Sequence, residues 1–136
     1  ETGTRIDAVI SEEMLGAIFY NGAPLHDGAT VIRGDRLIAA GCVLPLTQNR
    51  SLGKELGTRH RAGIGITEHS DAIAIIVSEE TGIISMAIDG ELSRFLDVKS
   101  VEKTLLNIYL SRLPDQKPGI FTRLFGRGED GNAGEE

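Results

Sequence analysis

The sequence predicts one α/β domain built on a mixed, antiparallel-rich β-sheet. Short apolar segments of strand length are separated by turn sequences, and two longer segments carry apolar residues at helical spacing. The length sets the size, because 136 residues can bury one hydrophobic core but are too few for two. With aromatic residues at 4%, aliphatic side chains must form most of that core.

The first helix is expected to begin after Ser11, whose hydroxyl can cap it. Glu12 and Glu13 follow in the first turn, where carboxylates face the positive end of the helix. Asn21 and Gly22 end it. The predicted buried stripe consists of Met14, Leu15, Ile18 and Phe19.

Two strands are predicted next, at residues 29–33 and 37–44, because Gly34 and Asp35 between them are typical of a hairpin turn. Pro45 stops the second strand, since proline cannot donate to a ladder. Residues 47–57 are polar and contain glycine, which predicts a surface loop able to carry function.

Residues 59–68 fit two structures. Residues 63–67 alternate as a strand does, whereas Thr58 followed by a basic run can open a helix. Gly63 and Gly65 weaken the helical interpretation, because glycine is a poor helix former. The pattern alone leaves both open.

The second half of the chain predicts further strands at residues 72–78 and 83–88, joined by a turn and paired antiparallel. Asp89 and Gly90 form a further turn of hairpin type. A helix closed by Pro114 is expected to pack on this sheet. Its apolar residues are Val101, Leu105, Leu106, Ile108, Tyr109 and Leu113.

The folded domain is predicted to span residues 1–113. Residues 114–136 contain a short apolar patch at 120–125, which either binds a partner or, as we expect, packs back on the domain. A run of glycine and acidic residues follows it. Such a composition predicts a largely disordered tail.

Composition also limits the function. A formal net charge of −6 argues against a broad surface for nucleic acid or anionic lipid, so any phosphate binding must be local. The single cysteine, Cys42, excludes an intrachain disulfide and fits the cytoplasm. No apolar run reaches the roughly 20 residues of a membrane span. Because the chain begins with Glu1, we expect it to be a segment of a longer protein.

Asp27 and Gly28 lie before a predicted strand. There a carboxylate can project from the strand edge, and glycine lets a ligand approach the backbone. Taken alone, the pair favours an Asx-type turn in which Asp27 bonds its own backbone.

A basic cluster and an acid pair follow. Arg59 and Arg61 offer forked donors that match phosphate oxygens, although a solvated turn paired with nearby acids explains them equally well. Glu79 and Glu80 end a predicted strand and could hold a divalent cation, although paired acids at a turn are usually only solvated. Together these segments supply the parts needed for metal-assisted phosphoryl transfer.

Read in order, three segments resemble the diadenylate cyclase family, and within it the membrane-anchored CdaA branch. They are residues 25–29 (LHDGA), 54–61 (KELGTRHR) and 76–82 (IVSEETG). The similarity runs from about residue 6 to about residue 110. It implies condensation of two ATP molecules into cyclic di-AMP with release of two pyrophosphates, on a twisted mixed sheet flanked by helices. It also favours a helix at residues 59–68.

The resemblance assigns roles as well. Asp27 would deprotonate or position the ribose 3′-hydroxyl, and Leu44 would offer its backbone to adenine, beside Val43 where relatives often carry an aromatic residue. The residues implied for catalysis are Asp27, Arg59 and His60. Those implied for ATP binding are Gly28, Leu44, Gly57, Thr58, Arg59, His60, Ser78 and Glu79. The implied metal ligands are His26 and Glu80. For Glu79 and Arg61 a supporting or structural role is the alternative.

A histidine nitrogen with a carboxylate oxygen suits Mn²⁺, with Co²⁺ or Mg²⁺ as alternatives. One motif set should hold one ATP, so catalysis is expected at the face-to-face interface of a homodimer. The family further implies a YbbR-type regulator and phosphoglucosamine mutase as partners, with no nucleic acid and no membrane contact by this segment itself. We expect a cytoplasmic catalytic domain, anchored in the membrane by a missing N-terminal region.

Overall fold

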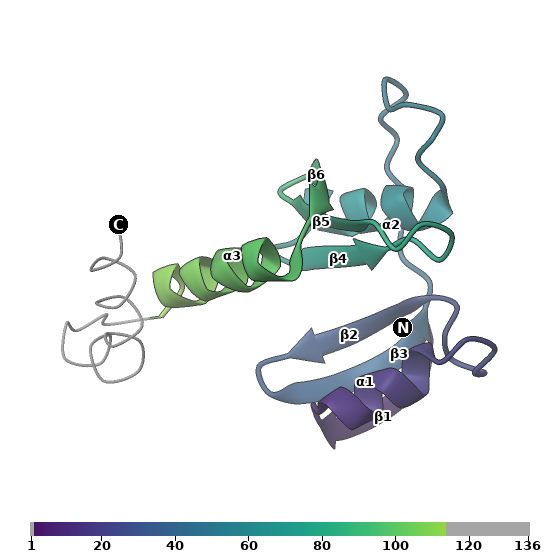
Figure 1. Cartoon of the computed structure of the whole chain (residues 1–136), viewed down its shortest axis with the longest axis vertical. Coiled ribbons are helices and arrows are strands. Elements are labelled where there is room, and N and C mark those ends of the chain that lie inside the picture. The colour runs from purple at the N-terminus through teal and green to yellow at the C-terminus, as the bar shows by residue number, and fades with distance from the viewer. Residues whose placement is uncertain (1, 114–136) are drawn as a thin grey trace. The chain divides into compact units, whose positions relative to one another are not determined.

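The computed structural model describes residues 2–113 of the chain (Figure 1). The chain divides into two compact units, Glu1–Phe95 and Leu96–Glu136, and the first contains every residue predicted for the site. The predicted α/β class with antiparallel strands is confirmed, and hydrogen bonding divides the strands between two three-stranded sheets. The predicted tail at 114–136 and its apolar patch lie outside the described residues.

The first sheet has the strand order β1-β3-β2, in which β1 (Thr4–Val9) and β2 (Ala29–Arg33) both pair antiparallel with β3 (Arg36–Cys42). The hairpin predicted around Gly34 is therefore confirmed. β3 ends two residues earlier than predicted, because the backbone groups of Val43 form hydrogen bonds with the side chain of Thr2 rather than with a neighbouring strand. The Val43 N–H donates to Thr2 Oγ1 at 2.9 Å, and the Thr2 hydroxyl lies 3.2 Å from the Val43 carbonyl oxygen.

The helix α1 (Glu12–Phe19) begins as predicted, with the Met14 N–H donating to Ser11 Oγ at 3.0 Å. Ile18 packs with Leu37 and Ala40 of β3 to form the core of this half. The prediction that Phe19 is buried is wrong, since its side chain is 50% exposed. At about 100° per residue, Phe19 lies roughly 90° from the centre of the stripe that faces β3.

The sequence does not predict β1, because the strand is irregular. Its register shifts between Arg5 and Ala8, and Asp7 has a positive φ of 57°. A bulge of this kind breaks the alternation by which strands are detected. Arg36 holds the bulge through Nη2, which lies 2.9 Å from Asp7 Oδ1 and 2.8 Å from the Asp7 carbonyl oxygen.

The second sheet has the order β4-β5-β6. The two predicted strands are confirmed as β4 (Ile73–Val77) and β5 (Ile84–Ile88), which pair antiparallel. β6 (Glu91–Leu96) follows the predicted turn at Asp89 and Gly90. The sequence does not predict this strand, since its segment is short and carries charged residues.

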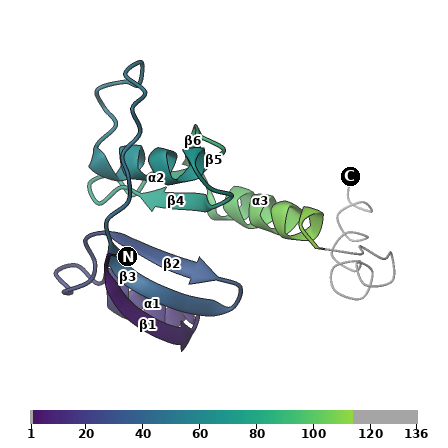
Figure 2. The ribbon, with the colours of Figure 1, turned by 180° about the vertical axis from the view of Figure 1, so that it is seen from behind.

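Residues 58–68 form the helix α2 (Thr58–Glu68), as the family resemblance favours, and this helix contacts β4 and β5 (Figure 2). Its Ile64 packs with Ile76 and Ala87 in the core of this half. The two glycines permit close approach. A Cβ on Gly63 would lie 2.8 Å from Ile76 Cδ1, and one on Gly65 would collide with the Pro45 carbonyl oxygen.

The second unit contains α3 (Val98–Ser111), which begins at Asp97, whose carboxylate accepts from the Ser100 N–H at 2.7 Å. The predicted helix is confirmed, although Leu106 and Tyr109 of its apolar set are exposed. Its predicted packing on the sheet stays a prediction. Within residues 2–113, no helix has the length and apolar character needed to cross a membrane.

Candidate functional site

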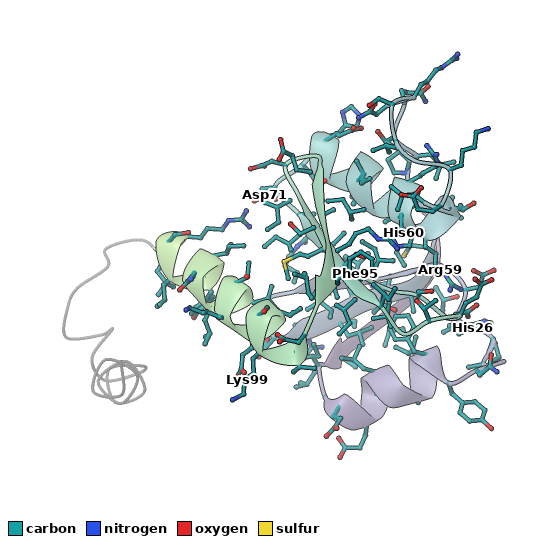
Figure 3. The ribbon with its side chains drawn as sticks, turned by 45° about the horizontal axis from the view of Figure 1, so that its top comes forward. His26, Arg59, His60, Asp71, Phe95 and Lys99 are labelled. Carbon is teal, nitrogen blue, oxygen red and sulfur yellow. The ribbon has the colours of Figure 1, made fainter. Side chains whose placement is uncertain are left out.

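Two loops and the start of a helix in the first unit bring four charged or ionisable side chains together. His26 and Asp27 precede β2, Arg59 lies in the first turn of α2, and Glu79 lies in the turn after β4. Arg59 Nη2 is 3.3 Å from Asp27 Oδ1 and 3.1 Å from Glu79 Oε2, and His26 Nε2 is 3.5 Å from Glu79 Oε2. The labelled side chains of His26 and Arg59 lie near one another in Figure 3. We call these four residues the ion-pair cluster.

Glu79 contacts both Arg59 and His26, which makes it the bridging member of the cluster. The hydrogen bond to Glu79 is the largest influence that raises the pKa of Arg59, while desolvation acts in the opposite direction. The Arg59 side chain is 37% exposed, whereas Asp27 is 84% exposed. The sequence places Glu79 among the ATP-binding residues but gives no sign of this bridge.

His26 is held at both ring nitrogens. Its Nδ1 lies 2.8 Å from the Ala23 carbonyl oxygen, which can only accept, so Nδ1 carries a proton. If Nε2 carries none, its lone pair faces the Glu79 carboxylate, and two acceptors face each other. A second proton or a cation at Nε2 makes this contact attractive. An Nδ1–H bond to a backbone carbonyl is also the usual way in which proteins orient a metal-binding histidine.

The amino end of α2 supplies free backbone donors. Gly57 is the N-cap residue and provides no side chain to bond the first-turn amides. Thr58 and Arg59 follow, and no acidic residue lies in this turn. A helix end of this kind attracts anions through its N–H groups and its dipole. This amino end is compatible with the phosphate contacts predicted for Thr58, Arg59 and His60, which stay predictions.

His60 lies inside this segment but is not a member of the ion-pair cluster. Its side chain is 8% exposed, and Nε2 has no hydrogen-bond partner among the described residues. Burial, and then the positive charge of Arg94, lowers the pKa of His60. The imidazole is therefore neutral near pH 7. Its predicted contact with phosphate stays a prediction, and it would have to be made by this buried, neutral ring.

The remaining predicted residues have local partners. Ser78 Oγ accepts from the backbone N–H groups of Glu80 and Thr81, each at 3.2 Å. A Cβ on Gly28, whose φ is 122°, would lie 2.8 Å from the backbone of Gly41, so this glycine has a packing role apart from any ligand. Leu44 follows β3 and is half-buried.

The predicted metal site is only partly assembled. His26 pairs with Glu79, and Glu80 makes no ion pair with it. In the part of the chain that the structure describes, no three or more His, Cys, Asp or Glu side chains are grouped to hold a metal ion. The donor chemistry of His26 fits a metal of the manganese type, but His26 and Glu80 alone would not complete its coordination.

The family model described as "DisA bacterial checkpoint controller nucleotide-binding", DAC, matches residues 1–92. A diadenylate cyclase of Listeria monocytogenes is 46% identical over 126 residues, which are 93% of this chain and 46% of that protein. The cyclic di-AMP synthase CdaA of Bacillus subtilis is 47% identical over 105 residues, 77% of this chain and 38% of that protein.

A solved structure is similar as well. The crystal structure of a double mutant of DacA from Staphylococcus aureus matches with a TM-score of 0.75 and 47% identity, over 78% of this chain and 71% of that one. Of the Listeria and Bacillus relatives, by contrast, the chain spans less than half the length. The chain belongs to the DAC family of nucleotide-binding domains.

Proposed function

We propose that this chain is the catalytic domain of a diadenylate cyclase, which condenses two ATP molecules into cyclic di-AMP. The observation that carries the proposal is the ion-pair cluster, in which two carboxylates and a histidine from two loops meet an arginine at the open amino end of α2. An arginine beside a helix amino end suits phosphates. A neighbouring carboxylate suits an attacking hydroxyl.

In the reaction proposed, the 3′-oxygen of one ATP attacks the α-phosphorus of the other. The bond from the α-phosphorus to the bridging oxygen of the β-phosphate breaks, and pyrophosphate leaves. Asp27 accepts the proton of the attacking hydroxyl, while Arg59 and the first-turn amides of α2 hold the phosphates. The same step in the opposite sense closes the ring and releases the second pyrophosphate.

A divalent cation, Mn²⁺ in the first instance with Co²⁺ or Mg²⁺ as alternatives, would neutralise phosphate charge at this site. His26 Nε2 and the carboxylate of Glu80 are the proposed ligands, with Glu79 already beside His26 at 3.5 Å. The protonated Nδ1, held by the Ala23 carbonyl oxygen, leaves Nε2 as the nitrogen available for this role.

We further propose that catalysis occurs at the interface of a homodimer. Residues 2–113 of one chain contain one such cluster, and the two reacting nucleotides must face each other with opposite sense, which a two-fold axis provides. Neither protomer could close the ring alone. The membrane anchor in a longer chain, the cytoplasmic location of this domain, the YbbR-type regulator and phosphoglucosamine mutase remain predictions from the family resemblance.

The test is incubation of the purified chain with ATP and Mn²⁺, followed by mass detection of cyclic di-AMP and pyrophosphate. We expect both products from the wild-type chain and neither from Asp27→Asn. ATP binding without release of pyrophosphate would refute the proposal and indicate a nucleotide-binding sensor module instead.

A further inference from the structure

Both carboxylates of the ion-pair cluster contact the same nitrogen of Arg59. Asp27 Oδ1 and Glu79 Oε2 lie 3.3 Å and 3.1 Å from Nη2. Nη2 carries two hydrogens, so these two contacts use both of them. Among the described residues, Nε and Nη1 of Arg59 donate no hydrogen bond to the protein.

This arrangement limits how a phosphate can bind. Each forked edge of a guanidinium, whether Nε with Nη2 or Nη1 with Nη2, includes the nitrogen that is already occupied. A phosphate can thus reach a single donor without disturbing the cluster, but a forked contact requires one carboxylate to leave Nη2. Since Arg59 carries one positive charge for two carboxylates, we expect a third anion that makes a forked contact to displace one of them.

The structure indicates which carboxylate leaves. Asp27 makes the longer contact, its side chain is 84% exposed, and Arg59 is its one ion-pair partner in the described chain. Glu79 makes the shorter contact, is 55% exposed, and also lies 3.5 Å from His26 Nε2, a contact that holds it when Nε2 carries a proton or a cation. His26 is itself fixed by the Ala23 carbonyl oxygen at 2.8 Å.

The backbone around Glu79 is also fixed. Ser78 Oγ accepts from the N–H groups of Glu80 and Thr81, and the Gly82 N–H donates to the Ser78 carbonyl oxygen at 2.9 Å. Glu79 is therefore the member that can keep Arg59 in place while its other partner changes.

We propose that Glu79 is a positioning residue, which holds Arg59 while a substrate phosphate replaces Asp27 on the guanidinium and so leaves Asp27 to receive the attacking hydroxyl. This inference rests on the proposed cyclase function for the identity of the hydroxyl. The exchange of partners itself requires only that a nucleotide phosphate reaches Arg59. Binding of substrate and release of the Asp27 carboxylate from Arg59 are then one event.

The first test measures binding, by calorimetry, of an ATP analogue with a methylene group between its α- and β-phosphates. Removing the charge of Asp27 removes a competitor for Arg59, so Asp27→Asn is expected to bind the analogue more tightly, by no more than about five-fold, as fits an exposed ion pair. If Asp27 instead contributes only attraction for the ribose, the variant binds more weakly, and that result overturns the exchange.

The second test separates kcat from KM. In Glu79→Gln the amide oxygen can still accept from Arg59, but the negative charge that pairs with the guanidinium is lost. We expect kcat to fall at least about ten-fold with KM within about three-fold, because the defect lies in holding Arg59 after binding. Glu79→Asp should recover part of kcat, and Glu91→Gln, an exposed acid on β6, should match the wild type.

A Glu79→Gln enzyme with unchanged kcat, or with KM and kcat changed in the way Glu91→Gln changes them, overturns the role of Glu79 even if the wild type makes cyclic di-AMP. A wild type that makes no cyclic di-AMP refutes the cyclase instead. The binding test with Asp27→Asn still decides the partner exchange in that case.

Discussion

Replacing Gly65 with alanine should destabilise the protein, although alanine is the better helix former. A Cβ at this position of α2 would collide with the Pro45 carbonyl oxygen and lie 2.9 Å from the Leu46 carbonyl carbon. Both atoms belong to backbone, so no side-chain rotation relieves the overlap. The segment after β3 must move away from α2.

That movement breaks the bonds that tie the segment to the helix. The Thr47 N–H donates to the Arg61 carbonyl oxygen at 3.0 Å, and Thr47 Oγ1 donates to Glu68 Oε2 at 2.6 Å. A neutral bond contributes about 1 kcal/mol and one to a charged group about 1.5–3 kcal/mol. The higher helix propensity of alanine stabilises the variant by about 1 kcal/mol. The net loss expected for Gly65→Ala is therefore about 1.5–3 kcal/mol.

The assay is urea unfolding followed by circular dichroism, with the loss read from the midpoint at constant slope. Gly16→Ala is the matched control, because Gly16 also lies inside a helix but a Cβ there meets nothing within 4 Å. It should stabilise by up to about 1 kcal/mol. The stability of Gly63→Ala should lie between those of Gly65→Ala and Gly16→Ala, because the new Cβ would meet the end of the Ile76 side chain, which can move. Equal or greater stability of Gly65→Ala than of the wild type would refute the reasoning.

Three further outcomes are expected. Specific activity should rise with enzyme concentration until the dimer saturates, and activity proportional to enzyme at strictly monomeric concentrations would contradict the two-fold site. Because burial and Arg94 lower the pKa of His60 in the folded state, the unfolded chain binds the proton more readily, so stability should fall as pH drops below about 6.5. Urea midpoints of His60→Gln should show a weaker pH dependence, and identical profiles would count against this cause. Ser11→Ala should lose about 1 kcal/mol by removing the cap on α1, whereas Ser11→Asp should keep it, as urea midpoints can show.

Local signals in the sequence were sufficient for the elements that obey local rules. Ser11 predicts the start of α1, and Gly34 with Asp35 predicts the β2–β3 hairpin, because caps and turns depend on a few neighbouring residues. The bulged strand β1 was missed, since its form depends on the distant Arg36. The sequence pattern alone could not distinguish a helix from a strand at α2. Gly63 and Gly65 are poor helix formers, and their presence is explained by close tertiary packing rather than by helix propensity.

The site shows the same division. The order of the motifs predicts that Asp27 and Arg59 act together, and the structure brings them within 3.3 Å. The bridge formed by Glu79 has no sequence signal, because it depends on how the turn after β4 lies relative to Arg59 and His26. The carbonyl contact of His26 is local, but it depends on the conformation of the loop that contains Ala23. The burial of His60 could not be predicted from the sequence either, because a run of basic residues usually indicates an exposed surface.

The charges of the ion-pair cluster explain why binding of a polyanion to this chain should depend on a divalent cation. Arg59 brings one positive charge to the two carboxylates of Asp27 and Glu79, in a chain whose formal net charge is −6. Repulsion between these charges and a triphosphate acts over roughly 10 Å at 0.1 M salt. Partner exchange on Arg59 redistributes this negative charge but does not remove it.

ATP should therefore bind weakly in the presence of a chelator and more tightly with Mn²⁺. Asp27→Asn, which carries one negative charge fewer, should lose less affinity than the wild type when the cation is removed. Calorimetric titrations of both proteins with and without Mn²⁺ measure the difference. If chelation weakens binding equally in the two proteins, the carboxylate of Asp27 does not compete with the phosphates, and the charge balance of the cluster does not explain the effect of the cation.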